Sequence, residues 1–357
     1  MGLVIEAKNN RQNNNKMNIH GGVINEKILD FSVNINPIPL SPSVKEALVE
    51  GINEINKYPE IIGESSIKFL GDYYNTSSKR IIIGNGAMEL IYLFARAFKP
   101  KEVMIISPTF NEYERAFKLN GAKIYHYVLE RENQFKLNVE DFLRTIVKKK
   151  PECVVICNPN NPTGQIIDKE TIKRIATQLK SWDGMLMLDE SFIDISFGAS
   201  CYNIKPQNIM VIQSLTKYYS IPGLRLGIGF ASPSIIEKLY TYKEPWTINT
   251  LALAALNPLL EDSERKEKTI QWLLDEKYYI ETNLMKFHYL NFYSSNTNFI
   301  LIKLEDSRLP KWLLKGDNPI KVRTCEDFIG LGKNFIRIAI KDHNDNRRLI
   351  HKMREYK

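Results

Sequence analysis

The stretch 211-VIQSLTKYYSIPGLRLGIG-229 decides the fold of this chain. It runs from a β-branched apolar segment into the hydroxyls of Ser214 and Thr216, then reaches Lys217, and after a Pro-Gly turn it reaches Arg225. Lysine and arginine are mostly exposed in folded proteins, so a lysine at the end of a buried strand is unusual. An ordinary solvated lysine is the simpler alternative, and the rest of the sequence has to decide between the two.

Length and composition narrow the class of protein. A chain of 357 residues with 43% hydrophobic and 25% charged residues suits one large globular domain with a smaller one beside it. The net charge is +8, but the 49 lysine and arginine residues are interspersed with 41 acidic residues. The densest basic run, Lys148 to Lys150, suits a helix C-terminus. We therefore expect no binding of nucleic acid.

Histidine and cysteine positions predict neither a metal site nor disulfides. The five histidines form no cluster with ligand spacing, and the four cysteines form no CxxC pair. We expect no metal and four reduced cysteines, as in a cytoplasmic protein. No apolar run approaches the length of about 18 residues that a membrane span requires.

Short apolar runs alternate with helical patterns from about residue 80. Runs that are apolar on both alternating faces are typical of a mostly parallel sheet covered by helices on each side, with segments such as 86–98 and 168–182 as crossover helices. After about residue 245 the pattern changes to a charged helical region at 262–287 and strands at 298–304 and 334–340. The seven strands expected in the main sheet are 80–84, 103–107, 123–128, 153–157, 185–189, 209–214 and 225–230.

Polar or turn-rich clusters follow five of these strands. In a parallel sheet the ligand lies beyond the carboxyl ends of the strands, so these clusters should meet at one edge. The clusters are 84–86, 107–110, 158–164, 189–190 and 214–217. A helix that begins at Gly86 would present free N–H groups to a phosphate, although a Gly-Asn-Gly turn alone is usually structural.

Lys217 and Asp189 add specific chemistry to this edge. A shielded lysine can lose its proton and attack a carbonyl carbon. Asp189 ends an apolar strand, where a carboxylate needs a cationic partner such as a protonated pyridine, unless it simply caps a helix. Together with a phosphate site, these two residues meet the requirements of pyridoxal phosphate.

Three motifs occur along the chain in a fixed order: 158-NPNNPTG-164, the strand-end Asp189, and 214-SLTK-217 followed by Arg225. The same order is found in the fold-type-I aminotransferases that use pyridoxal phosphate. The chain resembles this superfamily over about residues 20 to 340. The resemblance implies an α/β fold-type-I transferase, with the predicted seven-stranded sheet in a large domain and a smaller α+β C-terminal domain. It implies that Lys217 binds the cofactor covalently, that Asp189 pairs with the pyridine nitrogen and that Asn161 contacts the ring hydroxyl. The implied cofactor contacts also include Gly86, Ala87, Met88, Ser214, Thr216 and Arg225 around the phosphate, Phe110 stacked on the ring, and Tyr58 from the neighbouring subunit of a homodimer with shared active sites.

Three further stretches resemble the threonine-phosphate decarboxylase branch of the superfamily. They are 20-HGG-22 with 30-DFSVNINPIP-39, 108-PTFNEYERA-116 and 322-VRTCEDFIGLGKNFIRIAI-340, and Phe192 replaces a tyrosine that many other relatives carry. The resemblance implies decarboxylation of L-threonine O-3-phosphate to (R)-1-aminopropan-2-yl phosphate and CO2 in cobalamin biosynthesis. Histidinol-phosphate aminotransferase, which uses 2-oxoglutarate, stays open as the alternative. The implied substrate contacts are Arg337 with the carboxylate, Arg323 and His20 with the phosphate, and Ser32, Asn34 and Asn161 along the same cleft.

The expected organisation has four parts. Residues 1–18 are expected to form a flexible tail and residues 19–50 an N-terminal arm that packs with the small domain. Residues 51–245 are expected to form the large cofactor-binding domain, and residues 246–357 the small C-terminal domain.

Overall fold

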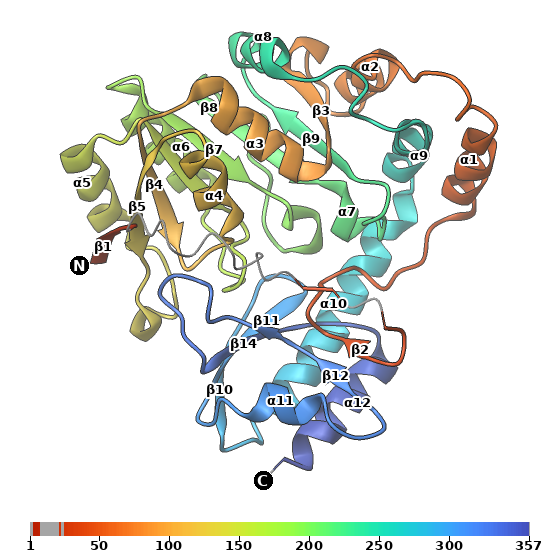
Figure 1. The fold of residues 1–357 in the computed structure, drawn as a ribbon, viewed down its shortest axis with the longest axis vertical. Helices are drawn as coiled ribbons and strands as arrows, with labels where there is room; N and C mark the ends of the chain where they lie inside the picture. The colour runs from red at the N-terminus through yellow and green to blue at the C-terminus, as the bar shows by residue number, and fades with distance from the viewer. Residues whose placement is uncertain (1–2, 8–20, 23–24, 357) are drawn as a thin grey trace.

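A computed structural model describes residues 3–7, 21–22 and 25–356, which form a larger and a smaller sheet with helices around them (Figure 1). The larger sheet has the strand order β1-β5-β4-β6-β7-β8-β9-β3. Strands β5, β4, β6, β7 and β8 are parallel, whereas β9 is antiparallel to both of its neighbours. Its strands are β1 (Leu3–Glu6), β3 (Ile81–Asn85), β4 (Glu102–Ser107), β5 (Lys123–Val128), β6 (Cys153–Cys157), β7 (Met185–Asp189), β8 (Ile209–Ser214) and β9 (Leu226–Phe230).

All seven predicted strands of this sheet are present, and their bounds differ from the prediction by a single residue at most. Alternate side chains enter two separate cores, as β6 illustrates. Val154 and Ile156 belong to one buried cluster, while Cys153 and Val155 belong to the other. Both faces of the sheet are therefore covered, which explains why its strands are apolar throughout.

The eighth strand replaces the predicted flexible tail at residues 3–6, while residues 8–18 of that predicted tail lie outside the described residues. Residues Leu3–Glu6 form β1 and pair antiparallel with β5, from Leu3 opposite Val128 to Glu6 opposite Tyr125. An apolar pattern could not reveal this strand, because Leu3 stays 62% exposed and Ile5 40% exposed. Pairing with the free edge of β5, rather than burial, accounts for the strand.

Different helices cover the two faces of the larger sheet (Figure 1). The crossover helix predicted at 86–98 is α3, and α5 ends in Lys148 and Lys149, as expected for basic residues at a helix C-terminus. On one face lie α3 (Gly86–Phe98), α4 (Glu112–Lys118) and α8 (Pro233–Tyr242); the core on the other face includes residues of α1 (Pro42–Ile52), α2 (Glu64–Tyr73), α5 (Val139–Lys149), α6 (Lys169–Lys180) and α9 (Thr250–Leu260).

The smaller sheet is antiparallel, in the order β10-β11-β14-β13, and the part of the N-terminal arm around β2 lies against it, whereas α1 lies by the larger sheet (Figure 1). Strand β2 pairs with β12, and the Ala339 N–H donates to the Phe31 carbonyl at 2.9 Å. The elements are β2 (Leu29–Asp30), β10 (Leu290–Tyr293), β11 (Phe299–Leu304), β12 (Ile320–Lys321), β13 (Arg323–Thr324), β14 (Phe335–Ala339), α10 (Ser263–Leu284), α11 (Leu309–Leu313) and α12 (His343–Arg354). The exact domain limits stay a prediction.

The cysteines, the helices and the candidate metal ligands are each described by the structure. All four cysteines are free and buried. Among the described residues, no helix is long and apolar enough to cross a membrane, and no group of three or more histidine, cysteine or acidic side chains is placed to hold a metal ion.

Candidate active site

The strand-end clusters meet around a cavity of about 260 Å³. This convergence follows from the parallel strands, whose carboxyl ends lie at the same edge of the sheet. Residues of the N-terminal arm and of the smaller sheet complete the wall. The predicted residues that line the cavity are Ser32, Asn34, Ala87, Met88, Phe110, Asn161, Asp189, Ser214, Thr216, Lys217, Arg225, Arg323 and Arg337.

Lys217 lies in α7 (Leu215–Tyr218), the short helix that directly follows β8. Its Nζ is 3.5 Å from the Ser214 Oγ and 5.4 Å from the centre of the Phe192 ring. Burial lowers the pKa of the Lys217 ammonium, while the nearby Asp189 carboxylate acts in the opposite direction. A lowered pKa increases the neutral fraction of the amine, which is the nucleophilic form.

Asp189 ends β7 and is 3% exposed. Its Oδ2 accepts a hydrogen bond of 2.7 Å from the Tyr113 hydroxyl, and its Oδ1 accepts one of 2.8 Å from the Ser191 N–H. Asp189 thus does not cap an α-helix, which was the alternative to a cofactor contact. Tyr113 was not among the predicted site residues, although it lies within 108-PTFNEYERA-116, three residues after Phe110.

The predicted phosphate site lies where α3 begins. Gly86 has φ +73°, and a Cβ there would lie 2.5 Å from Arg225 Nη2, so the guanidinium lies against the start of the helix. The hydroxyls of Ser214 and Thr216 are 2.7 Å apart and line the same cavity as Ala87. Helix N–H groups, two hydroxyls and a guanidinium are ligands that a phosphate prefers.

Two arginines form the wall contributed by the smaller sheet. Arg323 and Arg337 are directly opposite each other in the β13–β14 pair. Arg337 donates to the Ser32 carbonyl at 2.7 Å and to Asn161 Oδ1 at 2.5 Å, and burial lowers the pKa of Arg337 to about 10. Arg323 donates to Asp327 Oδ2 at 2.6 Å. Asp327, which was not among the predicted site residues, thus contacts this wall.

Among the predicted residues that the structure describes, two do not line the cavity. Gly86 lies beside it, next to Arg225. Tyr58 is 84% exposed and contacts the Trp246 ring, with 5.1 Å between the ring centres. Its predicted role requires a second subunit. His20 lies outside the described residues, so its predicted contact with the substrate phosphate stays a prediction.

The residues present fit pyridoxal phosphate. Two buried donors of the cavity wall, Asn34 Nδ2 and Arg337 Nε, have no hydrogen-bond partner in the part of the chain that the structure describes. Buried donors of this kind normally find a partner, so a polar ligand in the cavity would complete the site. The Lys217 amine, the Asp189 carboxylate and the predicted phosphate site all lie at the same cavity.

The sequence of residues 26–353 matches the family described as aminotransferase class I and II. The chain belongs to this family. Class I and II aminotransferases are pyridoxal-phosphate-dependent enzymes, and the cofactor chemistry inferred above agrees with this membership.

Three relatives show where the chain lies within the aminotransferase family. It is 38% identical to a protein named as a candidate threonine-phosphate decarboxylase of Caldanaerobacter subterraneus, covering 90% of this chain and 88% of the relative. It is 32% identical to the threonine-phosphate decarboxylase of Salmonella typhimurium, covering 93% and 92%. The structure of histidinol-phosphate aminotransferase from Clostridium acetobutylicum superimposes with a TM-score of 0.84 at 29% identity, covering 91% of this chain and 98% of that one.

Proposed function

We propose that the protein is a pyridoxal-phosphate-dependent carboxy-lyase. Its proposed reaction converts L-threonine O-3-phosphate into (R)-1-aminopropan-2-yl phosphate and CO2, in the aminopropanol branch of cobalamin biosynthesis. The decarboxylases among the relatives support this choice of substrate.

The observation that carries the proposal is the pair of arginines in the cavity wall. Arg323 and Arg337 are both 6% exposed and lie opposite each other, in the same cavity as Lys217. Two buried cations beside an amine suit an amino acid that carries two anionic groups, a carboxylate and a phosphate. We assign the carboxylate to Arg337 and the phosphate to Arg323, with Ser32 and Asn34 along the same wall.

The proposed chemistry assigns separate tasks to the residues of the chain. When bound, pyridoxal phosphate withdraws electrons from the Cα of the amino acid. Asp189 would keep a proton on the pyridine nitrogen, and Asn161 could contact both Arg337 and the ring hydroxyl, because an amide has two donors besides its oxygen. Arg337 would hold the carboxylate that leaves as CO2. The electron pair of the broken Cα–carboxylate bond would then form the new Cα–H bond with a proton from Lys217 Nζ or water.

Histidinol-phosphate aminotransferase is the alternative, favoured by the structural similarity to the Clostridium enzyme. Phe192 argues against it. Its ring packs edge to face on Phe299, with ring centres 5.0 Å apart, and it has no hydroxyl to offer to the cofactor. The family resemblance implies a tyrosine at this position in many other relatives.

Product analysis tests the proposal. Purified protein loaded with pyridoxal phosphate would be incubated separately with phosphothreonine, phosphoserine and histidinol phosphate, each with and without 2-oxoglutarate. We expect CO2 and an amino alcohol phosphate from phosphothreonine without 2-oxoglutarate. Formation of glutamate that requires histidinol phosphate, with no CO2 from phosphothreonine, would establish the aminotransferase instead.

We further propose a cytoplasmic homodimer in which Tyr58 contacts the cofactor phosphate of the partner subunit. The exposure of Tyr58 supports a dimer, because a large aromatic side chain at 84% exposure is available for a second subunit. Four free cysteines support a reducing compartment.

A further inference from the structure

Arg265 is buried although it carries a charge. It lies in the first turn of α10, and only 1% of the residue is exposed. The carboxylate within range is Asp262, whose Oδ2 is 4.0 Å from Arg265 Nη1, and burial lowers the pKa of the guanidinium. Burying a charge without a close counter-ion costs free energy. Other contacts must therefore stabilise the Arg265 guanidinium.

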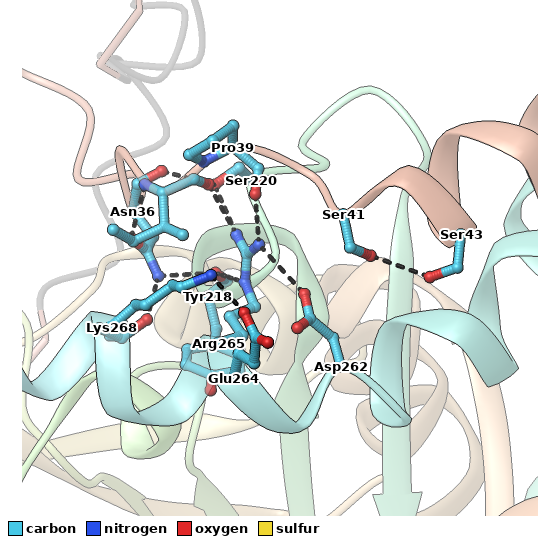
Figure 2. Close-up of polar contacts among 12 residues, drawn as sticks. Asn36, Pro39, Ser41, Ser43, Tyr218, Ser220, Asp262, Glu264, Arg265 and Lys268 are labelled. Atoms are coloured by element: carbon cyan, nitrogen blue, oxygen red, sulfur yellow. Dashed lines mark hydrogen bonds and ion pairs between the residues drawn. The ribbon is translucent and has the colours of Figure 1, made fainter.

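Neutral oxygens of two distant segments surround the guanidinium (Figure 2). Arg265 Nε donates to the Tyr218 carbonyl at 3.0 Å, and Nη2 donates to the Ser220 Oγ at 3.1 Å. Nη1 and Nη2 donate to the carbonyls of Pro39 and Ile38, both at 3.0 Å. Arg265 therefore ties the chain just after Lys217 to the N-terminal arm.

Asn36 makes a second set of bonds between the same two segments. Its backbone N–H donates to the Lys217 carbonyl at 3.0 Å, and its Nδ2 donates to the Tyr218 carbonyl at 3.0 Å. The Ser220 hydroxyl donates back to the Asn36 carbonyl at 2.5 Å. We call Asn36, Ile38, Pro39, Ser220 and Arg265, with the carbonyls of Lys217 and Tyr218, the Arg265 latch.

The latch joins two parts of the cavity wall that must be in place together. Ser32 to Ile35 line the cavity and directly precede Asn36. Lys217 lines the same cavity and directly precedes Tyr218, the first residue of the other segment that Arg265 contacts. Ser220 has φ +60°, a conformation that an L-residue keeps only when surrounding contacts hold it. Release of the guanidinium would free both the arm and the backbone that carries Lys217.

We propose that Arg265 is a positioning residue, which fixes the backbone of Lys217 against the substrate-facing arm. The catalytic importance of this inference rests on the proposed function, but the structural coupling does not. A planar guanidinium can donate in several fixed directions at once, whereas a lysine ammonium has three donors on one atom and cannot span the same set of oxygens. Arg265→Lys should therefore restore only part of the coupling.

Hydrogen exchange of the cofactor-free protein tests the coupling without any activity. The variants are Arg265→Met and Arg265→Lys, and the matched control is Lys268→Gln, which removes a cation from an exposed position one turn further along α10. Peptides covering 32–39 and 215–221 should exchange about tenfold faster in Arg265→Met, because local opening governs exchange. Peptides from β6 and β7 should be unchanged, and Lys268→Gln should match the parent.

The loaded enzyme gives the second measurement. Arg265→Met should lower kcat by on the order of 100-fold, as expected for a misplaced reacting group. It should also shift the pH at which the absorbance of the lysine–cofactor imine changes. If Arg265→Met does not fold, Arg265→Lys serves for both measurements.

Two results would overturn the inference. One is unchanged exchange at 32–39 and 215–221; the other is faster exchange spread evenly through β6 and β7, as expected if Arg265 only contributes to overall stability. A parent protein that forms no imine with pyridoxal phosphate would count against the proposed function. The exchange data would still decide on the latch.

Discussion

The Tyr113 hydroxyl donates a hydrogen bond of 2.7 Å to Asp189 Oδ2, and both side chains are buried. Burial and the Asp189 carboxylate raise the pKa of Tyr113 well above its usual value, so the phenol keeps its proton throughout the working pH range. The carboxylate therefore always has this donor. We propose that Tyr113 holds the Asp189 carboxylate in the orientation that its proposed pairing with the pyridine nitrogen requires.

Replacing Tyr113 by phenylalanine tests this relationship. Without the hydroxyl, Asp189 Oδ2 loses a buried hydrogen bond that helps to hold the carboxylate in place, so its proposed pairing with the pyridine nitrogen should weaken. We expect kcat/KM to fall about 10- to 100-fold, since a hydrogen bond to a charged group contributes about 1.5–3 kcal/mol. Tyr125→Phe is the control, because its hydroxyl contacts Glu102 away from the cavity. A loss below twofold in Tyr113→Phe would contradict the assigned role.

The two arginines of the cavity wall should affect different groups of the substrate. Arg323→Leu should abolish most of the preference for phosphothreonine over threonine, while Arg337→Leu should lower kcat/KM for both. Removing one member of a buried charge pair costs about 2–5 kcal/mol, which corresponds to a loss of roughly 30- to 4000-fold. Steady-state CO2 release with the two substrates measures the difference. Equal losses of the phosphate preference in both variants would show that the assignment is wrong.

Tyr58 allows a test of the shared active site. Tyr58→Phe and Lys217→Ala homodimers should both have low activity. After unfolding and refolding as an equal mixture, half of the dimers pair the two variants and hold one intact site, so about a quarter of the parent activity should return. Light scattering should give the mass of a dimer. No recovery from the mixture, or a monomeric parent, would contradict the proposed assembly.

Because Glu190 is buried, we expect the free energy of unfolding to depend on pH. Burial raises the pKa of Glu190 to about 7, and the nearby Asp194 carboxylate raises it further. The hydrogen bonds that Glu190 accepts from Ser200, Cys201 and Gln213 lower the pKa but do not cancel the effect of burial. Between pH 4.5 and about 7 the folded state binds more protons than the unfolded state, so this contribution to stability is present at low pH and is lost as the pH rises.

Glu190→Gln removes this titration. In urea unfolding of the cofactor-free protein, the parent should lose about 3 kcal/mol more than the variant between pH 4.5 and pH 8. The exposed Glu264→Gln is the control. Parallel pH profiles for the parent and Glu190→Gln would contradict the predicted pKa.

Much of the fold and site could be predicted because the signals are local. The strand 153-CVVIC-157 is apolar on both faces, and the parallel order then brings Asp189 and Ser214 to the same edge as Asn161. β1 could not be predicted, because an edge strand held by backbone pairing needs no apolar pattern. Arg265 gave no signal either, since most of its partners are backbone oxygens, up to 227 positions away in the chain.

The covalent link at Lys217 is the central claim, and it can be measured directly. The protein would be incubated with pyridoxal phosphate, reduced with borohydride, digested and analysed by mass spectrometry. We predict a single pyridoxyl adduct on the peptide that contains Lys217, and no such adduct in Lys217→Ala, which should also lack the imine absorbance. An adduct on another lysine, or an unmodified Lys217 in the reduced parent protein, would contradict the account.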